Sequence, residues 1–439
     1  ANLSACLKGK PHPGHKWHNK NKGGNAVLAT RVFGGAASAL RIATYRNYFI
    51  GHFVASVGRW MYRMSLGWLA WDLTGSTVWL GAVAFADLAP TAVLTPVAGA
   101  AADRFGTMRI IRASLLMSCI LPFILGVMTL AKVVSVEMLL IIALVNGCAE
   151  SFGQPARLAV INALVPKHDL SSAIALGSTS FNASRIVGPS IAGLIIVQAG
   201  VGVVMLLCSL GFVFFWNIVR RIKIEDGVKK GDRHGFLSEI IGGFTYTLQH
   251  KGILYVMVLL TATSMFIRPV IEMLPGLADK VFHTGPQGLS TMLAAIGVGA
   301  VTAAFLLARR GRTHGLTRLL VLSTFGTGIA VALAMQFTEL WLAAIFFTCM
   351  GIFMLIGNVS AQTLIQNSVA AEYRARVMGL FIMFGHGLPA LGALIQGWVA
   401  KYVGLQVAVG SGALLMLAFG MWSLYARKTM VAELERDPD

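Results

Sequence analysis

The chain has 439 residues, of which 56% are hydrophobic and only 12% are charged, and its formal net charge is +18. This composition provides too little polar surface for a soluble globule of this length, so it excludes a soluble fold and favours a protein solvated by lipid. A charge of +18 on a soluble protein would favour nucleic acid as a partner. Here the basic residues flank long apolar segments, so we expect no nucleic-acid binding.

Residues 1–46 are rich in Lys, Gly and Asn and contain no continuous apolar run. They predict a flexible basic tail. His12, His15 and His18 recur at three-residue intervals and could hold a metal ion, but the prolines and glycine between them argue against a preformed site. We therefore expect no metal here.

Twelve apolar runs of about 20 residues follow, each long enough to cross the roughly 30 Å hydrocarbon layer as a helix. They lie at 47–71, 77–100, 109–130, 136–156, 171–198, 200–220, 252–274, 288–307, 316–335, 340–361, 374–400 and 403–426. Strands of a membrane barrel would alternate apolar and polar residues, and these runs do not. The sequence therefore predicts an all-α membrane protein with twelve transmembrane helices.

The twelve runs fall into two groups of six. We predict an N-terminal six-helix bundle at 47–220, a cytoplasmic linker at 221–251, a C-terminal six-helix bundle at 252–426 and a cytoplasmic tail at 427–439. The linker is charged at first and then amphipathic at helical spacing, so its second part is expected to lie on the inner membrane face. A passive tether and a regulatory segment are both compatible with this pattern.

The basic residues are distributed asymmetrically about the predicted spans. Most of the 36 Lys and Arg residues lie in the two tails, the linker and the even-numbered loops. The exceptions are three lysines in odd-numbered loops and four arginines inside spans: Lys132, Lys280, Lys401, Arg59, Arg63, Arg185 and Arg268. Because cytoplasmic loops carry the excess of Lys and Arg, both termini are expected on the cytoplasmic side of a bacterial-type inner membrane.

A spacing of 204 residues relates the two groups of spans. Five of the six glycines between 147 and 200 recur at this spacing, and only Gly177 does not. The pairs are Gly147 and Gly351, Gly153 and Gly357, Gly188 and Gly392, Gly193 and Gly397, and Gly200 and Gly404. The chain is therefore an internal duplication that joins two membrane-embedded halves about a pseudo-twofold axis, the design of many secondary transporters.

The loop between the second and third spans carries a recognisable motif. Its main residues are Gly99, Asp103, Arg104, Gly106 and Arg109. It resembles the cytoplasmic loop signature of the major facilitator superfamily, although Thr107 and Met108 stand where further basic residues are usual. The resemblance implies a twelve-helix fold and a gate in which Asp103 and nearby arginines latch the two halves. The second half has a partial copy at 308–312, with Ala308 in place of the acid.

Gly188, Pro189 and Gly193 in the fifth span resemble the Gly-Pro motif of the superfamily's drug/proton antiporters. Glycines let a neighbouring helix approach closely, and proline bends the span. Gly392 and Gly397 repeat the two glycines, so plain packing is the alternative interpretation. The strings Gly58–Trp68 and Gln154–Arg157 are similar to the branch that contains the enterobactin exporter and macrolide efflux pumps.

Seven charged residues lie inside predicted spans, where each costs about 2.5–3.5 kcal/mol unless it is compensated. They are Arg59, Arg63, Asp87, Glu150, Arg185, Arg268 and Glu272. We predict that Asp87 is the counter-ion of the two arginines of the first span and that Glu150 pairs with Arg185. The other two charges are four residues apart on the seventh span.

These charges also suggest functional roles. A shift of 204 from Arg63 reaches position 267, next to Arg268, so both cations are expected near the pseudo-twofold axis. We predict a substrate cavity that contains Arg59, Arg63, Arg268 and Glu272, and proton coupling by Asp87 and Glu150 with Arg185. Salt bridges that merely hold helices together are the alternative.

The sequence favours a secondary active transporter, with proton-coupled efflux of a small amphipathic organic molecule as the leading hypothesis. Uptake or facilitated diffusion, and a transport-inactive receptor or scaffold, are the alternatives. The motifs GxxxxGK[ST], HExxH and GxSxG are absent from the sequence, which disfavours ATP-driven transport and enzymatic activity. We expect membrane lipid, the substrate and protons as partners, no cofactor, and a monomer.

Overall fold

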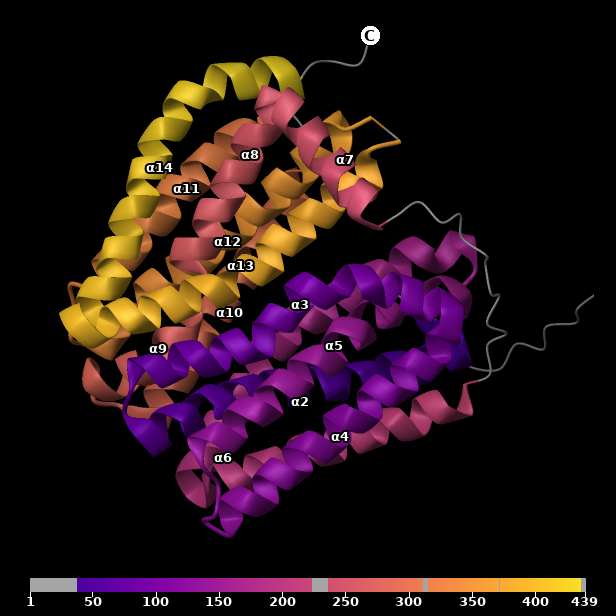
Figure 1. Ribbon diagram of the computed structural model, residues 1–439, viewed down its shortest axis with the longest axis vertical. Coiled ribbons are helices and arrows are strands. Elements are labelled where there is room, and N and C mark those ends of the chain that lie inside the picture. The colour runs from indigo at the N-terminus through magenta and orange to yellow at the C-terminus, as the bar shows by residue number, and fades with distance from the viewer. Residues whose placement is uncertain (1–37, 223–235, 311–314, 371, 436–439) are drawn as a thin grey trace, which may run out of the picture.

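The computed structural model describes residues 38–222, 236–310, 315–370 and 372–435 (Figure 1). The predicted tail up to residue 37, with its three histidines, and residues 223–235 of the predicted linker lie outside the described residues. The regular elements of the described part are all helices. Their bounds are η1 Ser38–Arg41, α2 Ala43–Thr74, α3 Thr77–Phe105, α4 Thr107–Leu130, α5 Val136–Leu164, η2 Lys167–Asp169, α6 Leu170–Arg221, α7 Phe236–Gln249, α8 Lys251–Ala262, η3 Thr263–Ile267, α9 Val270–Lys280, α10 Gly285–Arg310, α11 Leu316–Ala334, α12 Leu340–Ser368, α13 Arg374–Val403 and α14 Leu405–Leu434.

Within the described residues, ten helical segments are long and apolar enough to cross a membrane. One of them, Lys167–Arg221, is 55 residues long and contains two spans, and α2 adds a further span that is less apolar because it carries several charged and polar side chains. Span seven is built from α8, η3 and α9 in succession. The prediction of twelve membrane helices is confirmed.

The turns between the last two spans of each half depend on glycine. Gly200 interrupts α6 with φ 83° and Gly404 separates α13 from α14 with φ 85°. Residues with a side chain rarely adopt this conformation, so glycine is required at both positions. The two turns are 204 residues apart, as the repeat predicts.

The remaining repeated glycines lie at equivalent helix contacts in the two halves. A Cβ at Gly147 of α5 would meet the backbone of α3, and one at Gly351 of α12 would meet the backbone of α10. Gly153 of α5 lies against a serine of α4, and Gly357 of α12 lies against a serine of α11. Each glycine thus allows a close approach that a larger residue would prevent.

The last two pairs also lie at equivalent helix contacts, one pair within each half and the other between the halves. Gly188 of α6 packs on α2, while Gly392 of α13 packs on span seven. Gly193 of α6 packs on α10 of the other half, and Gly397 of α13 packs on α3 of the other half. This reciprocal arrangement is what a pseudo-twofold axis between two six-helix bundles requires. Pro189 lies inside α6, directly after the first of these glycines.

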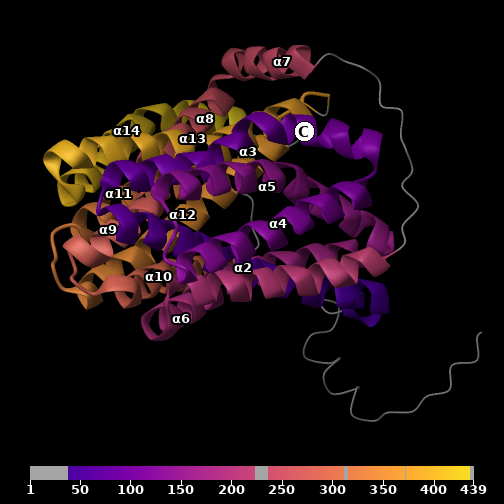
Figure 2. The ribbon, with the colours of Figure 1, turned by 60° about the horizontal axis from the view of Figure 1, so that its bottom comes forward.

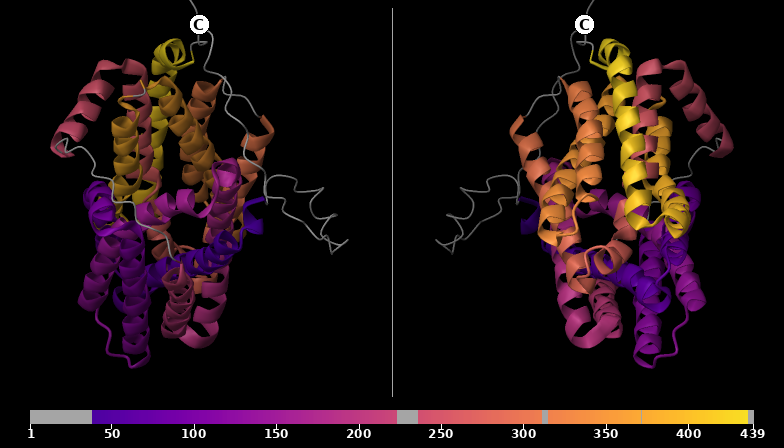
Figure 3. Two further views of the ribbon diagram at one scale, coloured as in Figure 1. Left: turned by 90° about the vertical axis from the view of Figure 1, so that its right-hand side faces the viewer. Right: turned by 90° about the vertical axis from the view of Figure 1, so that its left-hand side faces the viewer.

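The two bundles meet along α3 with α13 and α6 with α10 (Figures 1 and 3). We call the end at which α6 finishes and α7 begins the linker side, and the end with the Gly200 and Gly404 turns the distal side. On the distal side, polar bonds join the halves: the Thr77 hydroxyl donates to the Gly397 carbonyl at 2.8 Å, and Trp71 Nε1 donates to Asp279 Oδ2 at 3.0 Å. The helices of the two halves diverge toward the linker side (Figure 1).

Helix α7 occupies the predicted amphipathic stretch and lies across the outside of the second bundle (Figure 2). The ring of Tyr246 stacks on Tyr373 with 4.5 Å between ring centres, and Phe244 packs edge-on against Phe384 of α13. These contacts attach α7 to the beginning of α13, so it is part of the second half's packing.

Helix α14 runs to Leu434, eight residues past the predicted end of its span. Two carboxylates near its end cap other helices. Glu433 accepts from the Gly252 amide at 2.6 Å, and Glu435 accepts from the Gly315 and Thr317 amides at 2.9 and 2.6 Å. A carboxylate at a helix N-terminus satisfies free amides and complements the helix dipole, so α14 fastens the beginnings of α8 and α11.

Candidate functional site

A cluster of charges in the first bundle is centred on Glu150 of α5. Its Oε2 accepts from Arg59 of α2 and, at 2.6 Å, from Nη2 of Arg157, while its Oε1 accepts from the Ser118 hydroxyl of α4 at 3.1 Å. The side chain of Arg157 is 3% exposed. Two guanidinium groups therefore share one carboxylate, which leaves this cluster with a net positive charge inside the bundle.

Arg157 was not among the predicted membrane charges. The predicted fourth span ended at 156, next to Pro155, which placed Arg157 in the following loop. Helix α5 instead continues through this proline to Leu164. The signal was present in the apolar residues that follow Arg157, because they allow the helix to continue past this residue and place its side chain inside the bundle.

The predicted pair of Glu150 with Arg185 is wrong. Nη2 of Arg185 lies 3.4 Å from the carbonyl oxygen of Ile296 on α10. Arg185 stands on the side of α6 that packs against α10 of the other half, whereas Glu150 faces α2 and α4 within its own half. The two residues point to different neighbours, which sequence spacing alone does not reveal.

Asp87 of α3 is also paired differently from the prediction. Its Oδ1 accepts from Nδ2 of Asn146 on α5 at 3.0 Å, and the two arginines of α2 use other carboxylates. The cause lies in the packing: α3 packs mainly against α5 and α13, whereas α2 packs mainly against α6. The carboxylate of Asp87 therefore has a neutral partner.

Arg63 of α2 and Glu272 of α9 form an ion pair between the two halves. The guanidinium carbon of Arg63 also lies 5.8 Å from the centre of the Trp60 ring. Both charged side chains line a small pocket between α2, α9 and α10. Arg268 lies four residues before Glu272 on the same span, but Glu272 is paired with an arginine of the opposite half.

Arg268 points instead to two helices of its own half. Its Nη1 donates to the Gly385 carbonyl of α13 at 2.5 Å, and its Nη2 donates to Asn358 Oδ1 of α12 at 2.7 Å. The π-helical turn η3 directly precedes it, and its amide bonds to the carbonyl of Thr263, five residues earlier. A π turn takes in one extra residue, which accounts for the offset of 205 instead of 204 between Arg63 and Arg268.

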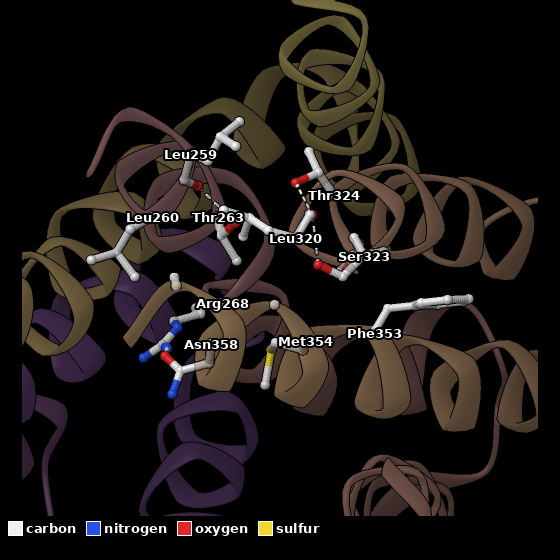
Figure 4. Close-up of a pocket in the computed structure, with 13 residues that line it drawn as sticks. Leu259, Leu260, Thr263, Arg268, Leu320, Ser323, Thr324, Phe353, Met354 and Asn358 are labelled. Carbon is white, nitrogen blue, oxygen red and sulfur yellow. Dashed lines mark hydrogen bonds between the residues drawn. The ribbon is translucent and has the colours of Figure 1, made fainter. Parts of the chain in front are cut away.

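The predicted substrate residues are thus divided among three places. Arg63 and Glu272 lie together between the halves, and Arg59 belongs to the cluster around Glu150. Arg268 lines a small pocket within the second bundle, between span seven, α11 and α12 (Figure 4). Asn358 is a further lining residue that the sequence did not single out.

The predicted gating loop forms a sharp turn between α3 and α4. Gly106 ends α3 and begins α4 with φ 91°, a conformation that favours glycine. The guanidinium carbon of Arg104 lies 5.5 Å from the centre of the Phe105 ring, and Arg109 is exposed on α4. The side chains at 99 and 103 lie outside the described residues, so the role of Asp103 stays a prediction. Among the described residues there is no group of side chains arranged for a metal ion.

The family described as transmembrane secretion effector matches residues 34–438 of this sequence. The chain belongs to this family of major facilitator transporters. The match extends over both bundles and the segment between them, so it agrees with the twelve helices and the duplicated architecture. The predicted superfamily, read from the loop motif and the Gly-Pro motif, is confirmed.

Curated relatives are similar over most of the chain. The staphyloferrin A transporter of Staphylococcus aureus is 25% identical over 82% of this chain and 90% of its own length. The multidrug efflux pump Tap of Mycolicibacterium fortuitum is 23% identical over 88% of this chain and 96% of its own length. The enterobactin exporter EntS of Shigella flexneri is 22% identical over 64% of this chain and 66% of its own length.

Two solved structures have the same fold. The nucleoside transporter NupG is 16% identical, with a TM-score of 0.62 over 90% of this chain and 100% of its own. A bacterial homologue of the human lysosomal transporter Spinster, solved in an inward-facing and occupied conformation, is 12% identical, with a TM-score of 0.69 over 91% of this chain and 99% of its own. At these identities the likeness concerns the fold. The protein is a multi-pass membrane transporter.

Proposed function

We propose that this protein exports small amphipathic organic molecules of the drug or siderophore class in exchange for protons, by alternating access. The observation that carries the proposal is the Arg63–Glu272 pair, which bridges the halves beside a pocket while the halves diverge toward the linker side. A polar centre closed on one side fits a carrier whose two bundles rock about it. Relatives named as a staphyloferrin A transporter, an enterobactin exporter and a multidrug efflux pump support this substrate class and direction.

The distribution of Lys and Arg supports an orientation with both termini and the linker in the cytoplasm of a bacterial cell, and the carrier acts as a monomer in the inner membrane. The linker side then faces the cytoplasm and the distal side faces outward. The conformation in Figure 1 is accordingly inward-facing. Substrate would enter from the cytoplasm toward Arg63 and Glu272, and the distal contacts would break when the carrier turns outward.

Four charged residues serve the substrate in this proposal. Arg63 and Glu272 offer one charge of each sign at the boundary of the halves. Arg268 offers a cation whose hydrogen-bond partners among the described residues are neutral oxygens. Arg59 contributes through the cluster around Glu150.

Proton coupling is assigned to Asp87 and Glu150 in different ways. Asp87 accepts a bond from the neutral Asn146, so a proton can bind without breaking an ion pair. Protonation of Glu150 would release both Arg59 and Arg157, so it would change how α2 is held against α5. Arg185, at the contact of α6 with α10, would transmit such a movement to the other half.

The loop of α3 and α4 is proposed as the cytoplasmic gate. Asp103, Arg104 and Arg109 would latch the linker side when the halves close there, with Gly99 and Gly106 allowing the tight turn. The glycines 188, 193, 392 and 397, with Pro189, provide the close contacts along which the halves rock.

The proposal is tested with purified protein in vesicles that carry an imposed pH gradient. We expect counterflow of a fluorescent amphipathic compound and faster export when protons run inward against it. Asp87→Asn should retain counterflow but lose its response to the gradient, while the matched control Asp72→Asn, at an exposed acid near the end of α2, should keep it.

Four results would overturn parts of the proposal. Exchange that ignores the pH gradient in the unaltered protein would remove the proton role. Net accumulation in the opposite direction would favour uptake, and equilibration without accumulation would favour facilitated diffusion. The absence of counterflow with every compound would favour a receptor or scaffold.

A further inference from the structure

The two halves carry different side chains at positions that the 204-residue repeat makes equivalent. Shifting the charge cluster of the first half by 204 residues changes Arg59 to Thr263, Glu150 to Met354 and Arg157 to Ala361. All three replacements line the small pocket in the second half. The place that three charged side chains fill in one bundle is therefore a pocket in the other.

The equivalence of these places follows from the glycine contacts. Gly153 lies beside Ser114 and Arg157 in the first cluster, and its partner Gly357 lies beside Ser323 in the pocket. In both halves the glycine lies on the fourth span, which packs against the third span: α5 on α4 and α12 on α11. The pocket and the cluster thus correspond in space as well as in sequence.

At one end of the pocket the side chains offer hydrogen-bond donors. Arg268 donates to the Gly385 carbonyl and to Asn358 Oδ1, and its buried Nε has no hydrogen-bond partner. Because Asn358 uses its oxygen for Arg268, its amide nitrogen remains to donate. A guanidinium and an amide that both donate favour a carboxylate as their ligand.

The remaining lining of the pocket is mostly apolar, and its hydroxyl groups offer hydrogen-bond acceptors. The hydroxyls of Thr263, Ser323 and Thr324 each donate to a backbone carbonyl one turn earlier, at 2.9, 2.7 and 2.9 Å. Their protons are thereby used, and only oxygen lone pairs remain for a ligand. Figure 4 shows these hydroxyls apart from the guanidinium of Arg268. A ligand that satisfies them must carry hydroxyl or amine donors.

The backbone is also irregular directly before Arg268. The π turn η3 shifts Arg268 by one residue relative to its counterpart in the first half and brings its guanidinium to the pocket wall. Pro269 follows and cannot donate to the carbonyl of residue 265, so the helix is interrupted at this point. Turns of this kind are frequently found at functional sites.

We propose that the pocket between span seven, α11 and α12 binds the carboxylate end of an organic acid that also carries hydroxyl or amine groups. The ligand's carboxylate would supply to Arg268 the negative charge that Glu150 supplies in the first half. This inference rests on the proposed export function and names its substrate class as acidic amphipathic molecules. At these equivalent positions the first half contains a permanent ion cluster and the second half contains a ligand subsite.

Binding to the purified full-length protein in detergent tests the subsite without requiring transport. The probes are amphipathic acids paired with their methyl esters, beginning with rhodamine 110 and its ester rhodamine 123, which differ in the carboxylate alone. Fluorescence polarisation should show the acid binding roughly tenfold or more tightly than the ester, because one charge-assisted contact is lost in the ester.

Three variants locate the effect. Arg268→Gln should remove the preference for the acid, whereas the control Arg318→Gln, at an exposed arginine of α11, should keep it. Met354→Glu places a carboxylate at the position equivalent to Glu150, so it should occupy Arg268 and abolish binding of the acid. Met354→Gln has the same size without the charge and should retain the preference. Thermal unfolding of each variant verifies that the fold is intact.

The proposal is overturned if no acid binds more tightly than its ester, or if the folded Arg268→Gln and Met354→Glu variants keep the preference. These results are separable from those of the transport assay. Acids that bind but do not exchange in vesicles would leave the subsite standing and remove the export function. Export of esters and cations by a protein that does not bind acids would remove the subsite and leave the exporter.

Discussion

The ion pair of Arg63 with Glu272 allows a quantitative test of how the two halves are held together. It joins α2 of the first half to α9 of the second, and Trp60 flanks the guanidinium. Neutralising either residue, by Arg63→Gln or Glu272→Gln, removes the bond between the halves but leaves the side-chain volume almost unchanged. We therefore expect the distal side to be open in a larger fraction of the molecules of each variant.

The magnitude follows from the exposure of the two side chains, 31% for Arg63 and 14% for Glu272. A fully exposed pair contributes about 0.2–1 kcal/mol, and loss of one partner of a fully buried pair costs about 3–5 kcal/mol. At intermediate exposure we expect about 1–2 kcal/mol. Since 1.4 kcal/mol corresponds to a factor of ten, the ratio of open to closed molecules should rise roughly 5- to 30-fold.

Spin labels on the two distal loops measure this ratio. Val133 lies in the loop before α5, Gln336 lies in the loop before α12, and both are exposed. Electron–electron distance distributions in a cysteine-free background should show more of the long distance in each single variant. The charge-reversed double variant should restore the short distance in part, and Lys401→Gln, at an exposed distal lysine, should change nothing. If the ratio of long to short distances in both single variants stays within twofold of the ratio in the parent protein, the reasoning is refuted.

Three further predictions concern stability in detergent. Glu150→Gln leaves Arg157 buried without its counter-charge and should cost about 3–5 kcal/mol, seen as a large fall in Tm; an unchanged Tm would contradict the ion cluster. Gly147→Ala drives a Cβ into the backbone of α3 and should cost about 1–3 kcal/mol, while Gly177→Ala, which has no neighbour within 4 Å, should cost none. Glu435→Gln weakens the cap of α11 and should cost about 1 kcal/mol, with the exposed Glu372→Gln as its control.

The spans, the duplication and the glycine contacts could be predicted from the sequence because each is a one-dimensional property. The length of an apolar run reports the thickness of the bilayer. A glycine such as Gly200 or Gly404, repeated at a fixed interval, reports a backbone conformation that other residues rarely adopt. The charged residues inside the membrane could likewise be predicted to need partners, since the cost of an uncompensated charge does not depend on the fold.

The identity of those partners was decided by the tertiary structure. The sequence predicted Asp87 as the partner of Arg59 and Arg63. In the structure α2 packs on α6 and α3 packs on α5, and the two arginines pair with Glu150 and Glu272 instead. The rotation of a helix about its own axis and the choice of its neighbours arise from the packing of all twelve helices together, and a single turn of π-helix can redirect a side chain. Composition and periodicity therefore determined that the chain is a duplicated membrane bundle with charges at its centre, and only packing in three dimensions determined which charges meet and where a pocket remains.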